Sequence, residues 1–556
     1  MPALSDAAAG LATTGLLVLL LALAYVPLGD HLARVLTPVR HSRVERLVYR
    51  AAGVDPDGRQ SARSYAVAVL AFSAVSVVAL VAILMGQSAL PFDRGLPGMG
   101  FAMALNTAVS FVTNTNWQSY GGESTLGHTA QMTGLAVQNF VSAAVGIAVA
   151  AALIRGFVAS RTGELGNFWV DLTRVVLRVL LPISVVGALV LVAGGVIQNF
   201  APDTVVTTVT GGSQTLPGGP VASQEVIKQL GTNGGGFFNA NSAHPFENPN
   251  PLTNLFLVFL MLVIPVALTR TLGTMLGDRR QGRAVLAAMT VLWAGALALT
   301  TWAETSGAGL AAGAAGAALE GKETQFGPWT SALFAVSTTG TSTGAVNAMH
   351  DSLSPAGGGV VLVNMLLGEV SPGGTGSGLY GMLVAAILAT FVAGLMVGRT
   401  PELLGKKIGA REMTFVSLYV LASPALVLIG LGVAMALPST PDAQGNAGAH
   451  GLSEVFYAYA SAANNNGSAF GGITVTSDFF QYTLAAAMLV GRLLPIVLVL
   501  GLAGSLAQAR PVPVTPGTLP TTTPLFVTLL VGVVLLVTGL TFFPGLALGP
   551  IAEALS

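Results

Sequence analysis

The sequence contains no cysteine and very little charge. The absence of cysteine excludes disulfide bonds, thiolate metal sites and cysteine-based catalysis. Charged residues make up 9% of the 556 residues, and the 24 basic residues balance the 24 acidic ones. A zero net charge gives no indication of a nucleic acid or of an acidic partner. The low charge also excludes an ordinary soluble domain, whose surface carries far more charged side chains.

Apolar residues, in contrast, are abundant and occur in long runs. They make up 53% of the chain, and the mean hydropathy is +0.73. Many runs approach the length of about 20 residues that an α-helix needs to cross a bilayer. The first run, Leu11 to Val26, lacks the basic start of a signal peptide, so we expect it to remain as a membrane helix. The chain is therefore predicted to be a multi-pass membrane protein.

Basic residues cluster between these runs. The loop after the first run carries seven arginines: Arg34, Arg40, Arg43, Arg46, Arg50, Arg59 and Arg63. Because Lys and Arg are enriched in cytoplasmic loops, this loop is predicted to lie inside and the N-terminus outside. The later runs alternate in direction across the membrane, and this alternation places all of the remaining basic clusters on the same inner side. It also leaves the C-terminus outside.

Four polar stretches recur at intervals of roughly 110 to 120 residues, which indicates repeats of one structural unit. They are Thr113–Gln118, Gly231–Asn239, Thr339–Gly344 and Asn464–Ser468. A helix too short to cross the membrane precedes each stretch, and an apolar return segment follows it. The predicted fold is an all-α polytopic membrane protein with about ten transmembrane helices and four re-entrant pore helices in fourfold pseudo-symmetry. The expected division is an N-terminal helix and basic loop (1–63), pore units (64–160, 161–283, 284–411 and 412–510) and a C-terminal helix (511–556).

These stretches have two interpretations. They could be ordinary turns outside the membrane, which glycine and asparagine favour. Alternatively, they could line a pore, because non-helical backbone at membrane depth is tolerated where it faces a watery cavity, and a ring of carbonyls can replace the water shell of a cation. The recurrence of the same arrangement four times favours the pore. None of the stretches contains Asp or Glu, so a potassium-like monovalent ion is favoured over calcium or magnesium.

Two charges are predicted to lie deep in the membrane. Glu369 and Arg492 each follow the top of their span by roughly 12 residues, or about 18 Å at helical rise. They occupy equivalent places in neighbouring units, so an ion pair between them is expected, with either a structural or a transport role. Near Glu369, the segment Ser371–Gly376 contains a proline and several glycines. It is predicted to break the third return helix.

Signs of catalysis are missing from the sequence. The phosphorylation motif Asp-Lys-Thr-Gly does not occur, and Phe237 stands where a phosphate-binding loop after Gly231–Gly236 would require lysine. The six histidines are scattered without metal-ligand spacing. If ATP supplies energy, its hydrolysis must take place in another chain.

The four stretches, with several neighbouring motifs, resemble the potassium-binding subunit family of Kdp-type potassium-transporting ATPases. The resemblance covers nearly the whole chain. Its other motifs are Trp117-Gln118, Phe237–Phe246, Glu320–Glu323, Ala348–Ser352 and Gly398–Glu402. The first stretch departs from the others in having Asn and Thr where they have glycine, so we do not expect exact fourfold symmetry.

The resemblance implies a potassium filter that is entered from outside, with a gate and a tunnel below it. The filter residues that it implies are Thr113, Asn114, Thr115, Asn116, Gln118, Thr232, Asn233, Gly234, Ser342, Thr343, Gly344, Asn464, Asn465, Asn466 and Gly467. The gate and tunnel residues are Glu369, Gly373, Gly374, Arg399 and Arg492. Potassium is the implied bound and transported ion, and no ATP is expected in this chain.

The resemblance also implies partners and a location. The partners are a P-type ATPase catalytic subunit (KdpB-like) and KdpC-like and small KdpF-like accessory subunits, in a bacterial cytoplasmic membrane. The leading hypothesis is therefore the ion-selecting subunit of an ATP-driven potassium importer. The alternative is a self-sufficient channel or potential-driven transporter of the same superfamily. A membrane enzyme or scaffold without a pore is disfavoured by the lack of catalytic motifs.

Overall fold

The computed structural model describes residues 6–37, 40–306, 318–396, 398, 400–513 and 518–555. In this part of the chain, ten helices are long and apolar enough to cross a membrane, which confirms the expected number. The spans are Asp6–Leu36 (α1), Ala62–Met85 (α3), Ala130–Val158 (ending in α6, Val137–Val158), Phe168–Ala193 (α7, Phe168–Val175, and α8, Leu181–Ala193), Pro251–Leu276 (α10), Arg279–Thr305 (α11), Ser377–Met396 (α15), Ala410–Met435 (α16), Asp478–Gln508 (α19) and Pro524–Leu555 (α20, Pro524–Leu546, and α21, Ala552–Leu555).

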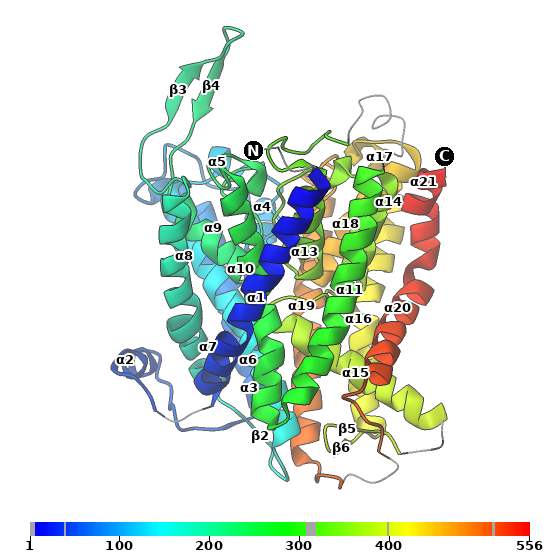
Figure 1. Ribbon diagram of the computed structural model, residues 1–556. Helices are drawn as coiled ribbons and strands as arrows, with labels where there is room; N and C mark the ends of the chain where they lie inside the picture. Colours follow the sequence, from blue (N-terminus) through cyan, green and yellow to red (C-terminus); the bar gives the residue numbers. More distant parts are fainter. Residues whose placement is uncertain are drawn as a thin grey trace.

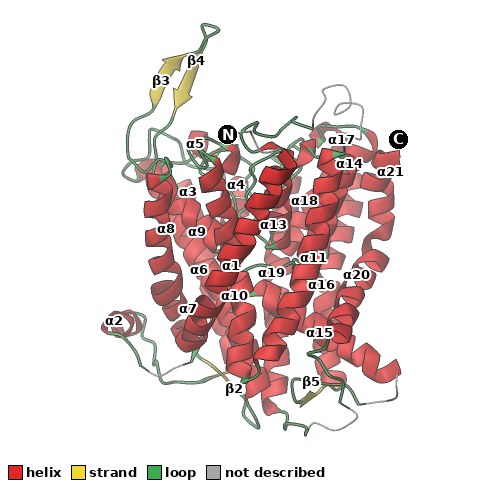
Figure 2. Cartoon of the chain, viewed as in Figure 1, coloured by secondary structure: helices red, strands yellow, loops and turns green. Residues whose placement is uncertain are grey.

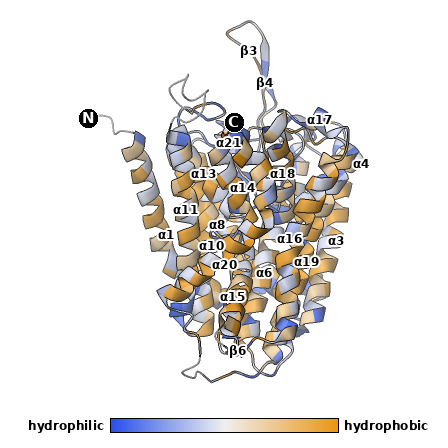
Figure 3. Ribbon diagram, turned by 90° about the vertical axis from the view of Figure 1, so that its right-hand side faces the viewer, coloured by the Kyte–Doolittle hydropathy of each residue, from blue (hydrophilic) through white to orange (hydrophobic). Residues whose placement is uncertain are grey.

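The long helices run side by side from one end of the bundle to the other (Figure 1). Strands are few and short, and all lie outside the helical body (Figure 2). They are β1 (Gln60–Ser61), β2 (Glu164–Gly166), β3 (Thr204–Thr207), β4 (Ser213–Leu216), β5 (Glu402–Leu403) and β6 (Lys406–Lys407). Apolar residues dominate the middle of the helices and polar ones gather at both ends, as a membrane protein requires (Figure 3).

Four short helices enter the bundle from one end, as the repeat predicted. They are α4 (Phe101–Val112), α9 (Val221–Leu230), α13 (Gly327–Gly340) and α18 (Gly448–Asn464). Each lies between an outgoing helix and a return helix, which gives four units: α3-α4-α6, α7/α8-α9-α10, α11-α13-α14/α15 and α16-α18-α19, where α14 is Pro355–Leu366. The fourfold repeat of an outgoing helix, a pore helix and a return helix is therefore present in the fold.

Burial separates the central helices from the peripheral ones. In the spans that contain α6 and α10, 83% and 78% of the most apolar 18-residue segment is buried inside the protein. In α1 only 11% of the corresponding segment is buried. Return helices of the units thus form the core around the pore helices, and α1 lies at the edge against α10. The outer surface of α1 is left to the lipid.

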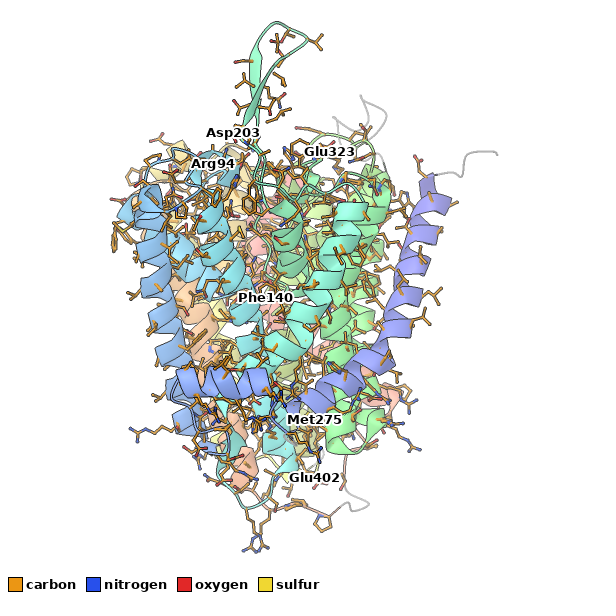
Figure 4. All side chains as sticks on the ribbon, turned by 90° about the vertical axis from the view of Figure 1, so that its left-hand side faces the viewer. Arg94, Phe140, Asp203, Met275, Glu323 and Glu402 are labelled. Carbon is orange, nitrogen blue, oxygen red and sulfur yellow. The ribbon has the colours of Figure 1, made fainter. Side chains whose placement is uncertain are left out.

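Smaller elements decorate the two ends of the bundle. The loop between α8 and α9 contains a hairpin of β3 and β4 that projects beyond the helices (Figure 1). Near its base, Asp203 forms an ion pair of 2.7 Å with Arg94 of the first unit (Figure 4). At the other end, the basic loop contains α2 (Arg43–Ala51), which lies across the direction of the bundle. The remaining short elements are α5 (Gly122–Thr125), α17 (Thr440–Ala443), the 3-10 turns η1 (Gln87–Ala89), η4 (Asn241–Ala243) and η5 (His350–Ser352), and the π turns η2 (Ala130–Ala136), η3 (Val176–Leu180) and η6 (Ala547–Ile551).

Candidate ion-binding site

The four polar stretches share one backbone conformation. In each, two residues with positive φ are separated by one residue without it. The pairs are Asn114 and Asn116, Thr232 and Gly234, Ser342 and Gly344, and Asn465 and Gly467. In an ordinary strand successive carbonyls point to opposite sides, but alternation of left- and right-handed residues turns the N–H groups to one side and the carbonyls to the other. Each stretch therefore presents a row of carbonyls on one side.

The same hydrogen bond anchors each stretch to its short helix. The middle residue of the conformation donates its backbone N–H to the carbonyl five residues earlier, at distances from 2.8 to 3.1 Å. The donor and acceptor pairs are Thr115 and Ser110, Asn233 and Lys228, Thr343 and Thr338, and Asn466 and Ser461. Because the N–H groups are used on the helix side, the carbonyls are free to face away from the helix. The repeat is therefore a repeat of hydrogen bonding as well as of sequence.

Close contacts between neighbouring stretches close them into a ring. A Cβ added to Gly234 would overlap the carbonyl oxygen of Thr343 in the third unit. In the same way, a Cβ on Gly344 would overlap the carbonyl of Asn466, and one on Gly467 would overlap that of Thr115. The glycines are thus needed for close approach of backbone to backbone, and not only for their positive φ. The order of contact is second, third, fourth and first unit.

Asn116 closes the ring between the first unit and the second. Its side chain donates to the carbonyl of Gly234 at 3.1 Å and to the side chain of Asn139 at 2.7 Å. Asn114 donates in parallel to the carbonyl of Thr232 at 2.7 Å. Asparagine tolerates a positive φ better than most residues, so it can replace glycine here while adding a hydrogen bond. The departure of the first stretch from the glycine pattern therefore has a structural role.

Within the described residues, one layer of carbonyls in the ring accepts no hydrogen bond from the protein. The residues at this level, Thr115, Asn233, Thr343 and Asn466, are all fully buried. No hydrogen bond within the described residues ends on their carbonyl oxygens. Buried carbonyls are almost always hydrogen-bonded, and four orphans at one level need an explanation. A desolvated cation is one ligand that four converging carbonyls can bind.

A cavity of about 730 Å³ lies above the ring, on the side from which the pore helices enter. Residues from all four units line it, among them Asn116, Gly235, Gly344 and Gly467. Gln118 lies at its base, where its side-chain oxygen accepts from the backbone N–H of Gly236 at 2.8 Å. The cavity therefore connects the ring to the end of the bundle from which the pore helices enter.

A chain of neutral groups supports the ring beside this cavity. His350 contacts the hydroxyl of Tyr457 at 2.8 Å, and that hydroxyl contacts Ser468 at 2.8 Å. Burial, with a smaller contribution from the charge of Lys322, lowers the pKa of His350 to about 4. The imidazole is therefore uncharged at neutral pH and adds no positive charge to the cavity.

Below the ring, the third return helix is broken as predicted. It ends at Leu366 in α14 and resumes at Ser377 in α15. The break is tied to the ring by backbone contacts: Gly373 donates to the carbonyl of Gly340 at 2.7 Å, and Thr375 donates to the Thr232 hydroxyl at 2.9 Å. The connecting segment thus lies directly beneath the second and third stretches.

The expected ion pair between Glu369 and Arg492 is not formed. No ion pair in the described part of the chain joins the two residues; Glu369 instead accepts a hydrogen bond from the Asn466 side chain at 2.8 Å. Both residues line a cavity of about 150 Å³ below the ring, with Tyr380 and Tyr419. The expectation of a pair assumed that both residues lie on helices. Glu369 instead follows the end of α14 and has a positive φ of 51°. The side chain is thereby aimed up at the ring.

One buried charged cluster was not predicted from the sequence. Lys228, whose carbonyl anchors the second stretch, contacts Glu225 at 2.6 Å and forms a close ion pair with Glu247. All three side chains are at most 1% exposed. The spacing of Glu225 and Lys228 on a short helix was visible in the sequence, but Glu247 lies beyond the stretch and its contact depends on the fold. Arg399, the remaining predicted tunnel residue, lies outside the described residues.

Comparison with known proteins gives a consistent result. A model of the family described as potassium-transporting ATPase A subunit (KdpA) matches residues 15–555. A protein of Kineococcus radiotolerans, named potassium-transporting ATPase potassium-binding subunit, is 60% identical over 553 residues, which cover 100% of this chain and 99% of the relative. A protein of Streptomyces coelicolor with the same name is 58% identical over 536 residues, with 96% and 97% covered.

A solved structure shares the fold at low identity. The potassium transporter TrkH from Vibrio parahaemolyticus superposes with a TM-score of 0.53 and 17% identity, covering 79% of this chain and 84% of that chain. At this identity the likeness concerns the fold alone. The extent of the family match and the identity to full-length relatives decide the classification: this chain belongs to the potassium-transporting ATPase A subunit family.

Proposed function

We propose that this chain is the potassium-binding and ion-selecting subunit of an ATP-driven potassium importer. The relatives that carry the name of a potassium-binding subunit support the proposal. The observation that carries it is the ring of four buried, unpartnered carbonyls at Thr115, Asn233, Thr343 and Asn466. The proposed filter consists of these residues and the other members of the four stretches, with Gln118 at its mouth.

The chemistry of the ring accounts for the choice of ion. Carbonyl and hydroxyl oxygens can replace the hydration shell of a large monovalent ion. They lack the negative charge of the carboxylates that calcium and magnesium sites normally contain. The carboxylate of Glu369, which lies below the ring, accepts a hydrogen bond from the side chain of Asn466 and is not among the oxygens that line the ring. Potassium is therefore the proposed bound and transported ion.

The proposed route enters through the outer cavity and turns sideways below the filter. The segment around Gly373 and Gly374 lies across the direct path, since it is hydrogen-bonded to the base of the ring. The lower cavity extends from Ser342 at the ring to Thr538 in the peripheral helix α20. We propose that Glu369 and Arg492 belong to this gate and tunnel, together with Arg399, which lies outside the described residues; the tunnel delivers the ion to a partner.

The partner would supply the energy. The chain itself is a non-catalytic subunit of its family, and the proposed partner for ATP hydrolysis is a P-type ATPase catalytic subunit (KdpB-like). KdpC-like and small KdpF-like accessory subunits complete the proposed complex. The proposed location is the bacterial cytoplasmic membrane, with both termini outside, because the basic loops gather at the end opposite to the termini (Figure 1).

Purification with and without partners tests the assignment. Potassium-stimulated ATPase activity that co-purifies with this chain, and that is lost when the filter is altered, is the expected result. A chain that carries potassium flux alone in vesicles, with no ATPase associated, would instead establish the alternative of a self-sufficient channel or potential-driven transporter.

A further inference from the structure

An apolar pocket of about 260 Å³ lies between α1, α10 and α11. Leu21 and Ala22 of α1, Val266 of α10, and Met289 and Trp293 of α11 are among its walls. The pocket lies under the peripheral helix α1, most of whose surface faces the membrane, and Ala22 in its wall is itself exposed. It is thus an apolar recess at the lipid-facing edge of the protein.

The inner end of this pocket is Pro372, a buried residue of the break below the filter. The next residue, Gly373, donates its N–H to the carbonyl of Gly340 at 2.7 Å, at the end of the third pore helix. An occupant of the pocket would therefore touch a segment that is hydrogen-bonded directly to the base of the ring. The pocket connects the lipid-facing surface to the proposed gate.

The opposite end of the pocket points toward basic residues at the end of the bundle. Arg279 precedes Leu286 of the pocket wall by two helical turns, so it lies on the same face of α11, about 10 Å nearer the membrane surface. The side chain of Arg279 is exposed. Met275, four residues earlier at the end of α10, is labelled in Figure 4 and shows this end of the bundle. Arg270 of α10 also lies at this end, in a 2.8 Å ion pair with Asp30 of α1.

We propose that the pocket binds an acyl chain of an anionic phospholipid whose phosphate group lies at Arg279. An apolar wall with a positive charge at the membrane surface matches the chemistry of such a lipid. Arg279 and Trp293 are separated by about 21 Å along α11, which is close to the thickness of one leaflet with its headgroups. The lipid comes from the cytoplasmic leaflet in the orientation proposed above, and its chain end contacts Pro372. The effect on the gate, but not the binding itself, depends on the proposed function.

Fluorescence quenching by brominated lipids tests the binding. The intact complex is placed in vesicles that contain phosphatidylglycerol or phosphatidylcholine with brominated acyl chains, and the share of Trp293 is isolated by comparison with Trp293→Phe. We expect the Trp293 signal to be quenched at a several-fold lower mole fraction of brominated phosphatidylglycerol than of phosphatidylcholine. Arg279→Gln should remove this preference. Arg280→Gln, which changes the adjacent exposed arginine about 100° around the helix, should retain it.

A second pair of variants tests occupancy of the pocket and its contact with the gate. Ala22→Phe fills the pocket from α1, whereas Leu23→Phe adds a ring on the exposed side of the same helix, where Leu23 is 66% exposed. Ala22→Phe should abolish the preferential quenching and change the potassium concentration for half-maximal ATPase activity at least threefold; Leu23→Phe should change neither. Equal quenching by both lipids, or preferential quenching that survives Ala22→Phe, would overturn the site. Unchanged half-saturation in Ala22→Phe would overturn only its link to the gate.

Discussion

Gly234 lies so close to Thr343 that a Cβ on the glycine would overlap the threonine carbonyl oxygen. The two residues belong to different repeats, and their contact joins the second and third stretches of the ring. Gly234 also has a φ of +80°, a conformation that side chains disfavour. Two independent physical reasons therefore require glycine at this position.

Replacement of Gly234 by alanine separates these two reasons. We expect Gly234→Ala to raise the potassium concentration for half-maximal ATPase activity at least tenfold, because the new methyl group displaces a carbonyl of the ring. Gly234→Asp, which adds a charge as well, should also lose selectivity. Gly277→Ala is the matched control, since Gly277 has a φ of +72° and no heavy atom within 4 Å of an added Cβ. It should cost only about 1 kcal/mol in stability and leave the affinity unchanged; equal effects of Gly234→Ala and Gly277→Ala on affinity would contradict a role for the contact.

Asn116 is expected to act through its side chain. Asn116→Gly keeps the backbone conformation but removes the hydrogen bonds to Gly234 and Asn139. Potassium affinity should therefore fall about five- to tenfold, which corresponds to a loss of about 1 kcal/mol, the typical contribution of a hydrogen bond. Asn139→Ala should have a smaller effect of the same sign. In the double variant, the effect of Asn139→Ala should disappear, because its partner is already absent. Additive losses would show that the two asparagines act independently.

The two glycines of the break should differ in their tolerance of alanine. At Gly373, which has a φ of +88°, a Cβ would overlap the backbone of Gly378 and the carbonyl of Glu369. At Gly374, whose φ is not positive, the nearest atom to an added Cβ is the Ser377 hydroxyl, which can rotate away. The next are Ser342 Cβ at 3.0 Å and the Thr341 carbonyl at 3.2 Å, which need to shift by only a few tenths of an ångström. We expect Gly373→Ala to uncouple ATPase activity from rubidium uptake or to increase passive leak, and Gly374→Ala to be nearly silent. Unchanged coupling and leak in both variants would count against a gate at this segment.

His450, near the start of the pore helix α18, is expected to make stability depend on pH. Hydrogen bonds to Asp351 and Glu553 raise its pKa to about 10 from an ordinary value of 6.5. Its stabilising contribution is therefore complete below about pH 6.5 and is lost as the pH rises toward 10. The Tm of the purified complex should fall over this range, and His450→Gln should lower the Tm by about 2 °C or more at pH 7 and flatten the pH dependence.

His244 provides the control for this measurement. Burial lowers its pKa to about 4, so it is uncharged from pH 7 to pH 10. The pH dependence of the Tm should be the same in His244→Gln as in the original chain. A pH dependence that persists unchanged in His450→Gln would show that another group is responsible.

Much of the fold could be predicted because its signals are local. The length of each apolar run, the basic loops and the recurring polar stretches are properties of contiguous segments, and they predicted the ten spans and four pore helices. The break between α14 and α15, which contains Gly373, was also predictable, because proline and glycine act on their own backbone. In contrast, the hairpin of β3 and β4 was not expected, since a polar outer segment carries no hydrophobic pattern that distinguishes strand from loop.

The partners of charged side chains were harder to predict. Glu369 and Arg492 occupy equivalent depths, but the break rotates Glu369 toward Asn466 and away from a pair with Arg492. Lys228 similarly acquires Glu247 as a partner only because the chain after the second stretch folds back onto α9. Helical spacing alone predicts neither contact.

The amino-acid sequence by itself determined that this is a membrane protein with four neutral, irregular segments at membrane depth, because hydropathy and glycine content act along the chain. Only the tertiary structure decided which oxygen faces which neighbour. Asn116 and the carbonyl that it holds are 118 residues apart, and each contact of the ring joins two repeats in this way. Such contacts arise because each pore helix packs against return helices that come from distant parts of the chain, so no single segment encodes them.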